Sequence, residues 1–592
     1  MLKMRRKSIA YFALALVFLV LLGLMWNRLF YAMPNMDETY AVAEPYQIIV
    51  GNRPFADIWT PTQGASILLS PIIRLYRLVT GGMDGLMLFM RQAYFFSKIF
   101  FALLCILALK RKTGLFCAVL AVAPTIFLVP YSMPIMNYSA TSADLALLSS
   151  ILIFSSNSFS KRKFALFVSG VVSAVAAVFY PPLIVYVFFN VICIFVMYRQ
   201  TSGNKIAFQS AKFYSIGAIL SAGIFFAVFL AMAGGISGIA VGVRGILNSP
   251  NMENHSYAGL YDILHTYLLS YIIRHFKFVI IFIIAVSVII GVLILLKRRI
   301  SVHKNSLFIF VMYGLATCFA AFFFIIPLRP GSYFYVFYML IAFAATAAAY
   351  FIDSKDDRRF YLFAMIIPAW CVFLVRTVAT TNRNIFGQFV VVMPFIVCLI
   401  WFFYRKLSTS EIIKRVHRIC VPIMSVIIAS VCLLSFYTLI IPFPSPSEAA
   451  DLYSISHFST KIESGLFRGI YSEPEMAGDI QELEQAISSF SRTGKSVLVL
   501  DYFSAAYLMT NMTPHTPNTW SFLYGSNSDD YARLYFDITE RSPDTIFVIR
   551  HEEVSYPIDD DDFEFNVYIA RNYKQIHHYI SNKFELIVFE RT

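Results

Sequence analysis

Charged residues are scarce in this chain: they make up 14% of its 592 residues, whereas 58% are hydrophobic. Acidic residues are scarcest before residue 442, where only 12 occur against 37 basic ones. This composition excludes an ordinary soluble protein, in which about a quarter of the residues are charged. Apolar runs long enough to cross about 30 Å of hydrocarbon recur along most of the chain, so the sequence predicts a polytopic membrane protein.

Cysteine patterns and phosphate-binding loops are also missing. All eight cysteines lie in apolar segments, which excludes a disulfide framework and a zinc-type spacing. The C-terminal part lacks a glycine-rich phosphate loop, so nothing there supports nucleotide binding. It carries 11 basic and 23 acidic residues, so the net charge of +13 comes from the part before residue 442. That positive charge belongs to loops between spans and does not indicate a nucleic-acid partner.

The apolar runs predict about thirteen membrane spans in a mainly α, polytopic helical bundle. They lie near residues 8–26, 86–109, 114–130, 140–156, 163–179, 181–198, 212–233, 277–296, 306–327, 333–352, 360–378, 386–404 and 418–441. The even-numbered spans end in basic loops, such as Lys110–Lys112 and Lys161–Lys163. Basic loops stay in the cytoplasm. We therefore expect a cytoplasmic N-terminus and, because the span count is odd, an extracytoplasmic C-terminal part.

One span boundary has two interpretations. The Tyr180-Pro181-Pro182 break is either a tight turn between two spans or a kink in one long helix. Only the turn preserves the alternation of basic loops, so we expect a turn.

The chain is expected to divide into a transmembrane domain, 1–441, and an external α/β domain, 442–592. The second domain opens with the linker-like PFPSPS. Helical patterns cover 475–489 and 529–542, and strand patterns cover 496–501, 544–550 and 584–591. This alternation of strands and helices predicts a parallel sheet.

Four of the 12 acidic residues before position 442 gather in one stretch, Tyr31–Ser70, directly after the first apolar helix. They are Asp37, Glu38, Glu44 and Asp57. One interpretation is that they are solvated loop charges. The other is a chemical site, because an Asp-Glu pair just outside a membrane can act as a general base or hold a divalent cation. The residues do not decide whether a cation or any other cofactor is used.

Several basic residues would lie at the same membrane surface, where guanidinium groups suit a phosphate because they offer a rigid fork of donors. These residues are Arg53, Arg91, Arg244, Arg274, Arg329 and Arg376. The histidines of the external connection, His265 among them, show no metal-binding spacing.

Two basic residues share one face of the second span, Arg91 and Lys98. For Arg91 the alternatives are a site role or snorkelling to the membrane interface. Lys98 would lie near the middle of the membrane, where a charge normally faces the bundle interior. It is either a site residue or half of a structural pair with Asp144.

The order of motifs at the start of the chain resembles a known family. One span is followed by the external Asp37-Glu38 pair, a GNRPFAD turn (Gly51–Asp57) and a segment leading to a further helix. This order is similar to GT-C superfamily membrane glycosyltransferases, and most closely to the branch of protein O-mannosyltransferases and lipid A aminoarabinose transferases. The resemblance covers about the first 130 residues and the overall topology. It implies a multi-span bundle whose first external loop carries two surface helices, often followed by a soluble domain.

The resemblance also implies an activity: an inverting sugar transfer from a polyprenyl-phosphate donor to an acceptor outside the cytoplasm. The acceptor would be a glycan, lipid or protein of the cell envelope. Asp37 matches the position of the family's catalytic carboxylate, and Glu38 matches the adjacent acid. The residues expected to bind substrate are Arg53, Asp57, Arg91, Lys98, Asp144, Arg244, His265, Arg329 and Arg376.

Two other classes compete with a transferase. A transporter or a flippase for lipid-linked glycans usually shows internal repeats, and none is evident in this sequence. An envelope assembly protein would use the spans only as an anchor and bind partners through the C-terminal part, but anchoring does not need so many spans.

Overall fold

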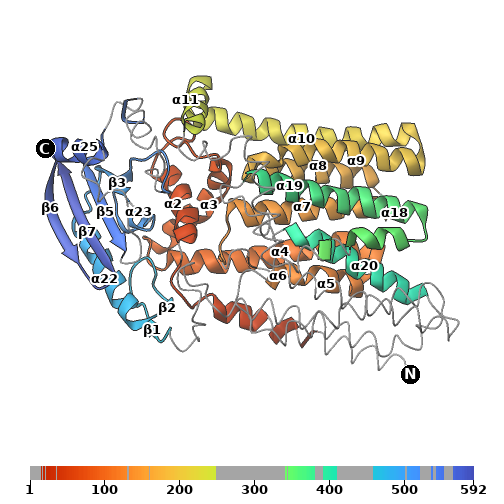
Figure 1. The fold of residues 1–592 in the computed structure, drawn as a ribbon, viewed down its shortest axis with the longest axis horizontal. Helices are drawn as coiled ribbons and strands as arrows, with labels where there is room; N and C mark the ends of the chain where they lie inside the picture. Colours follow the sequence, from red (N-terminus) through yellow and green to blue (C-terminus); the bar gives the residue numbers. More distant parts are fainter. Residues whose placement is uncertain are drawn as a thin grey trace, which may run out of the picture.

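The structure is a computed structural model that shows a bundle of long helices with a β-sheet at one end (Figure 1). The residues it describes are 15–16, 18–20, 22–34, 36–127, 129, 133–158, 161–248, 341–342, 345–379, 391–409, 458–500, 503–520, 535–537, 542–551 and 564–592. Within this part the expected fold class is confirmed: a mainly helical, membrane-type bundle is combined with a C-terminal α/β region.

The helices of the described part vary from short turns to rods of almost thirty residues. They are α2 (Met36–Ile49), α3 (Gln63–Thr80), α4 (Leu86–Thr113), α5 (Leu115–Val122), α6 (Pro124–Phe127), α7 (Tyr138–Ser155), α8 (Arg162–Phe179), α9 (Ile184–Ser202), α10 (Asn204–Met232), α11 (Ile236–Leu247), α18 (Lys355–Tyr361), α19 (Ile367–Ala379), α20 (Met393–Thr409), α22 (Pro474–Ser489), α23 (Ala506–Met509) and α25 (Glu564–Asn572). The five-residue π-helix Leu362–Ile366 joins α18 to α19.

Six helices of the described part are long and apolar enough to cross a membrane. They are Leu86–Thr113, Tyr138–Ser158, Arg162–Phe179, Pro181–Ser202, Asn204–Met232 and Lys355–Ala379. Each coincides with an expected span. The spans expected near 277–296, 306–327 and 418–441 lie outside the described residues, so the count of thirteen stays a prediction.

The expectation of one span over 114–130 is wrong for a continuous helix. The segment is divided into α5 and α6, and Pro124 is the first residue of α6. Proline lacks the N–H that would continue the hydrogen-bond ladder of α5, so the helix is interrupted here. Neither piece alone is long enough to cross about 30 Å of hydrocarbon.

The Tyr180-Pro181-Pro182 break is a turn, as the charge alternation predicts. Helix α8 ends at Phe179, and a single 3-10 turn leads into α9. The guanidinium of Arg162, at the start of α8, lies 5.1 Å from the ring centre of Tyr198, near the end of α9. The two helices therefore form an antiparallel hairpin.

Small and hydroxyl-bearing residues hold the helices of the bundle together. A Cβ at Gly170 of α8 would lie 2.0 Å from the Tyr214 carbonyl oxygen of α10, so only glycine permits this crossing. The Ser149 hydroxyl of α7 lies 2.8 Å and 2.6 Å from the hydroxyls of Ser169 and Ser173 on α8. Such contacts replace the hydrophobic driving force, which is absent between helices in lipid.

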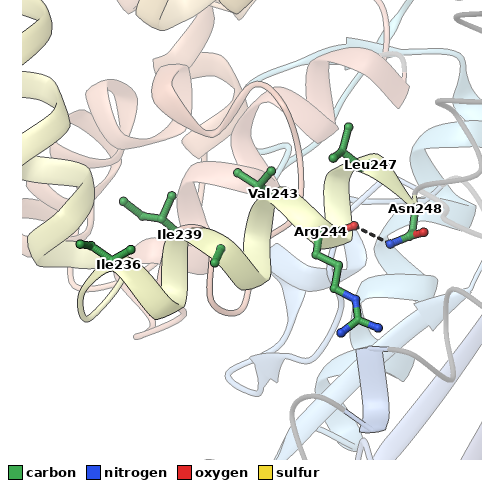
Figure 2. Close-up of a pocket in the computed structure, with 7 residues that line it drawn as sticks. Ile236, Ile239, Val243, Arg244, Leu247 and Asn248 are labelled. Atoms are coloured by element: carbon green, nitrogen blue, oxygen red, sulfur yellow. Dashed lines mark hydrogen bonds between the residues drawn. The ribbon is translucent and has the colours of Figure 1, made fainter.

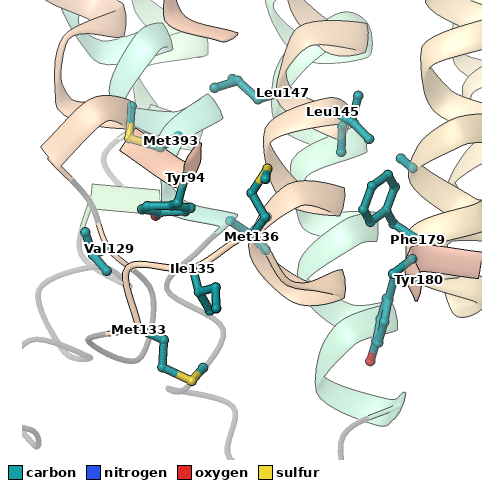
Figure 3. Packing of buried hydrophobic residues seen from close by; sticks show 14 of the residues in the cluster. Tyr94, Val129, Met133, Ile135, Met136, Leu145, Leu147, Phe179, Tyr180 and Met393 are labelled. Carbon is teal, nitrogen blue, oxygen red and sulfur yellow. The ribbon is translucent and has the colours of Figure 1, made fainter. Parts of the chain in front are cut away.

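Larger apolar side chains fill the space between α4, α7 and α8 (Figure 3). Tyr94 of α4, Met136 before α7 and Phe179 of α8 are among the buried residues drawn there. This packing fixes how the ends of these helices, which carry most of the candidate site residues, lie relative to one another.

The C-terminal region contains a five-stranded sheet with strand order β4-β3-β5-β7-β6. Its strands are β3 (Ser496–Leu500), β4 (Thr513–Pro514), β5 (Thr545–His551), β6 (Tyr573–Ile580) and β7 (Phe584–Arg591). A second, two-stranded sheet pairs β1 (Thr460–Lys461) with β2 (Tyr471–Ser472).

The expectation of a parallel sheet is only half right. Strand β3 pairs in parallel with β4 and β5, but β7 pairs antiparallel with both β5 and β6. Strands β6 and β7 are joined by a short turn, and a hairpin reverses the chain direction. The expected helix over 475–489 and the three expected strands are confirmed. Of the helix expected over 529–542, only 535–537 and 542 are described, and the domain boundary at 441 lies outside the described residues.

The two ends of the bundle carry different parts of the chain (Figure 1). At one end the sheets meet the segment after the first helix: the Ala32 amide donates to the Tyr471 carbonyl (3.0 Å). At the other end the basic loops gather, and the Lys112 ammonium donates to the Phe154 carbonyl (3.0 Å). The stretch Tyr31–Ser70 and the C-terminal region thus lie together, opposite the basic loops. Which end faces the cytoplasm stays a prediction.

Candidate functional site

The Asp37-Glu38 pair lies in the first turn of α2. Acidic side chains are favoured there because the helix dipole places partial positive charge at its N-terminus. The stretch Tyr31–Ser70 is therefore not an open loop: it contains α2 and the first part of α3, the two helices that the resemblance implies.

Glu38 is fixed by Arg91 of α4. Both are buried, and Arg91 donates from Nε to one carboxylate oxygen (2.8 Å) and from Nη2 to the other (3.2 Å). The Nη1 group of Arg91 donates to the carbonyls of Leu29, Tyr31 and Ala32 at 3.0–3.3 Å. The guanidinium therefore joins the end of the first helix, the start of α2 and α4 in one cluster.

Asp37 has a different environment. Its side chain is half-buried, and in the described part of the chain no basic side chain forms an ion pair with it. Burial, followed by the charge of Glu38, raises the pKa of Asp37 from its ordinary 3.8 to about 6. A carboxylate with a pKa near the working pH is a better proton acceptor than an ordinary one.

Glu44, one turn and a half further along α2, is fully buried among hydroxyl groups. The Thr60 hydroxyl donates to its Oε1, and the Thr62 hydroxyl lies 3.2 Å from its Oε2. Burial raises the pKa of Glu44, and the hydrogen bonds from these hydroxyls oppose that shift. The carboxyl group ties α2 to the start of α3.

The GNRPFAD motif is a closed turn. The Asp57 carboxylate accepts hydrogen bonds from the Arg53 amide (2.8 Å) and from Arg53 Nε (3.2 Å). Gly51 and Phe55 both have positive φ, 109° and 64°. Asp57 therefore has a structural role as the residue that closes the turn, while the Arg53 side chain is 59% exposed. Substrate contacts by either residue stay a prediction.

Helix α11 packs over this turn and presents Arg244 (Figure 2). A Cβ at Gly242 would lie 2.5 Å from Phe55 Cα, and one at Gly245 would lie 2.1 Å from the Trp59 ring, so glycine allows the close contact. Arg244 is exposed and helps to line a shallow apolar hollow with Ile236, Ile239, Ala240, Val243, Leu247 and Asn248.

Lys98 and Asp144 form an ion pair, which is the structural alternative that the sequence offered to a role of Lys98 in the site. The Lys98 ammonium lies 2.9 Å and 2.7 Å from the two Asp144 oxygens, and the side chains are 3% and 13% exposed. The pair joins α4 to α7 inside the bundle. Its geometry accounts for both charges without a ligand, and a substrate contact by either residue is untested.

Arg376 of α19 is buried beside the start of α7. It donates to the Ser139 carbonyl (2.9 Å), to the Ser142 hydroxyl (3.0 Å) and to the Ser139 hydroxyl. Its guanidinium lies 5.0 Å from the ring centre of Tyr180. The remaining candidates, His265 and Arg329, lie outside the described residues.

Sequence reasoning missed Arg28, the last helical residue before the segment that leads to α2. Its Nη1 atom is buried and has no hydrogen-bond partner in the described part of the chain. The side chain interacts electrostatically with both Glu38 and Arg91, so it belongs to the same cluster. Its place directly after the first apolar run was the only available signal.

The C-terminal region packs against the segment between α2 and α3. The Trp59 amide donates to the Pro517 carbonyl (2.8 Å), and the Trp59 ring lies 5.0 Å from that of Tyr535. Trp59 is buried with Leu498 and Ile546 in the core that covers one face of the sheet. The stretch Tyr31–Ser70 therefore supplies part of the C-terminal core.

No metal site can be assigned within the described residues. There, no three side chains of His, Cys, Asp or Glu come close enough together to hold an ion. The use of a divalent cation by the Asp37-Glu38 pair stays open.

Comparison with known proteins gives similarity in structure alone. No protein-family model and no curated protein matches the chain. Among solved structures it is similar to the oligosaccharyltransferase of Archaeoglobus fulgidus, a GT-C superfamily glycosyltransferase. The complex of that protein with Zn and sulfate matches at 11% identity and a TM-score of 0.40, over 90% of this chain and 67% of the other.

Two further structures of the same archaeal protein give similar values. AglB in complex with an inhibitory peptide and a dolichol-phosphate matches at 11% identity and a TM-score of 0.42, over 92% of this chain and 69% of the other. The form tethered to an acceptor peptide matches at 10% identity and a TM-score of 0.40, over 96% and 73%. Similarities at this level assign no superfamily, activity or substrate to this chain.

Proposed function

We propose that this chain is a membrane glycosyltransferase that transfers a sugar from a polyprenyl-phosphate donor to an extracytoplasmic acceptor, with Asp37 as the general base. The observation that carries the proposal is the contrast between two neighbouring acids. Glu38 is neutralised by Arg91, whereas Asp37 is half-buried and has no ion pair in the described part of the chain. Asp37 is therefore a carboxylate without a neutralising partner among the described residues, beside the fixed Glu38–Arg91 pair at the end of a membrane bundle. A carboxylate in that position can accept a proton.

The chemistry that we assign to this arrangement is a single displacement. A hydroxyl or amine of the acceptor attacks the anomeric carbon of the sugar and gives its proton to an oxygen of Asp37. The bond between that carbon and the phosphate oxygen breaks, the configuration inverts, and polyprenyl phosphate leaves with the bonding electron pair. Asp37 is mostly ionised at pH 7 because its pKa is about 6.

Negative charge that develops on the leaving phosphate requires a positive group. Arg28 is the best candidate, since its buried Nη1 atom lacks a hydrogen-bond partner within the described residues. Arg91 donates to Glu38 and to three carbonyls, so we assign it a positioning role for α2. Arg53 and Arg244 are exposed at the same end of the molecule and are the next candidates.

The test is the release of polyprenyl phosphate by the purified full chain. The protein is incubated with a panel of polyprenyl-phosphate sugars, labelled in the lipid, together with an envelope extract that supplies acceptors. We expect free polyprenyl phosphate to appear with at least one donor, and only when the extract is present. Movement of intact labelled donor across a vesicle bilayer without any release would instead identify a flippase.

A further inference from the structure

A hollow opens at the end of the bundle that lies away from the sheets. It has a volume of about 720 Å³, and we call it the basic hollow. It is lined by Asn157, Lys161, Arg162, Lys163, Phe164, Phe167 and Phe213. Three consecutive cations thus lie beside three phenylalanines, at the boundary between the short loop after α7 and the apolar surface of α8 and α10.

The part of the chain that the structure describes does not supply a counter-charge for these cations. Between Asp144 and Glu253 the sequence has seven basic residues and no acidic one. Two acids at the same end of the bundle are engaged elsewhere: Asp356 with Arg359 and Asp357 with Arg405. Within the described residues, no carboxylate lies within ion-pair distance of the basic hollow.

The local backbone makes this positive charge more costly. Arg162 and Lys163 are the first two residues of α8, and no side chain caps this end of the helix. The helix dipole places further positive charge here, where cations are unfavourable and an anion is stabilised. The Nε atom of Arg162 is buried and has no hydrogen-bond partner among the described residues.

The other half of the basic hollow is lined by phenylalanine side chains. Phe164, beside the cations on α8, is 64% exposed. The Lys163 ammonium lies 5.3 Å from the ring centre of Phe213, so charge and aromatic surface are in direct contact. A ligand that matches the hollow must combine an anionic group with a hydrocarbon chain.

We propose that the basic hollow binds one anionic phospholipid, with the headgroup phosphate at Lys161–Lys163 and an acyl chain along the phenylalanines. The positive-inside pattern predicts that this end faces the cytoplasm, where the leaflet carries anionic lipids. The site is separate from the Asp37 cluster, which lies at the opposite end of the bundle. It would hold the helical hairpin of α8 and α9 at a fixed depth in the membrane.

Native mass spectrometry of the full chain tests the proposal. The purified protein is titrated with phosphatidylglycerol or with zwitterionic phosphatidylcholine of the same acyl chains. We expect one phosphatidylglycerol to be retained at concentrations that leave phosphatidylcholine unbound. The double variant Lys161→Gln and Lys163→Gln should bind phosphatidylglycerol about 30-fold more weakly, because each cation near the surface contributes about fivefold in affinity.

Matched variants separate a built site from general electrostatics. Arg199→Gln with Lys205→Gln removes two exposed cations at the same end of the bundle but outside the hollow, and should leave retention unchanged. Lys161→Arg with Lys163→Arg keeps the charge and should also retain the lipid. Equal loss from both Gln pairs, equal binding of the two lipids, or equally tight binding of inorganic phosphate would overturn the proposal.

Discussion

Both ends of the helical bundle contain ion pairs, but the end away from the sheets also holds a run of three cations with no acidic partner among the described residues. At the end that carries α2, basic side chains meet acids: Arg91 binds Glu38, and Arg53 binds Asp57. At the other end Lys161–Lys163 have no acidic partner within the described residues. A buried or membrane-level charge is costly unless it is neutralised. Where the described residues provide no partner, we propose a ligand or a chemical step: an anionic lipid at Lys161–Lys163 and proton transfer at Asp37.

The largest expected effect comes from Asp37→Asn. This change removes the carboxylate that has no ion pair among the described residues, and it leaves the pairs Arg91–Glu38 and Arg53–Asp57 intact. Loss of a general base should lower the transfer rate about 10²–10⁴-fold. The thermal midpoint at pH 7 should not fall and is expected to rise, because ionisation of the half-buried Asp37 carboxylate opposes folding and the Asn side chain carries no charge. Initial rates and thermal unfolding of the purified variant in detergent measure both quantities.

The matched control for this variant is Glu38→Gln. It leaves Arg91 buried without its counter-charge, so it should lower stability as well as activity. If Asp37→Asn were the less stable of the two variants, the contrast between the two acids would be wrong.

The second-largest expected effect is a loss of stability when the Lys98–Asp144 pair inside the bundle is broken. Lys98→Met leaves the Asp144 carboxylate buried without a partner and should destabilise the protein by about 3–5 kcal/mol. The double variant Lys98→Met with Asp144→Met should recover most of that loss, because no charge is left unpaired. Denaturant unfolding in detergent gives the comparison. Additive losses in the double variant would contradict the structural pairing of the two residues.

The third effect is a pH dependence of the transfer rate. The raised pKa of Asp37, about 6, means that the base form exists above this pH and is lost below it. The rate should therefore fall about tenfold per pH unit below pH 6. Stability moves in the other direction: ionisation of this group opposes folding, so its contribution declines as the pH rises from 3.8 to about 6. A rate that stays constant from pH 7 to pH 5 would assign the base role elsewhere.

The smallest effect belongs to the exposed pair of the GNRPFAD turn. Arg53→Gln removes an ion pair whose basic side chain is 59% exposed, so the loss of stability should stay below about 1 kcal/mol. Asp57→Ala should cost more, because the carboxylate also accepts the Arg53 amide. Thermal unfolding of both variants ranks them, and the reverse order would contradict the assignment of Asp57 as the turn-closing residue.

Much of the bundle could be predicted because apolar length and loop charge are local properties. The six long apolar helices and the turn at Pro181 follow from them. The pairing of Lys98 with Asp144 was predictable as one of two alternatives, because a charge inside an apolar span is costly unless an opposite charge neutralises it. The break at Pro124 follows from the proline itself, which cannot continue the hydrogen-bond ladder of α5.

The rest depends on contacts between distant segments. Asp37 and Glu38 are neighbours in sequence, and only the return of Arg91 from α4 distinguishes them. Strand β6 was missed because its residues are mostly polar and exposed, and the hairpin with β7 makes the sheet mixed. Arg28 was missed because the lack of a hydrogen-bond partner for its Nη1 becomes visible only once the chain has folded around it.

The measurement that tests the central claim most directly follows a labelled sugar in sealed vesicles that contain the full chain, a polyprenyl-phosphate sugar and the envelope acceptor fraction. With the natural sequence, the label should become covalently attached to an acceptor. With Asp37→Asn it should remain on the lipid. Equal attachment by both proteins, or passage of the labelled lipid across the bilayer with no attachment, would contradict the assignment of Asp37 as the base of a glycosyl transfer.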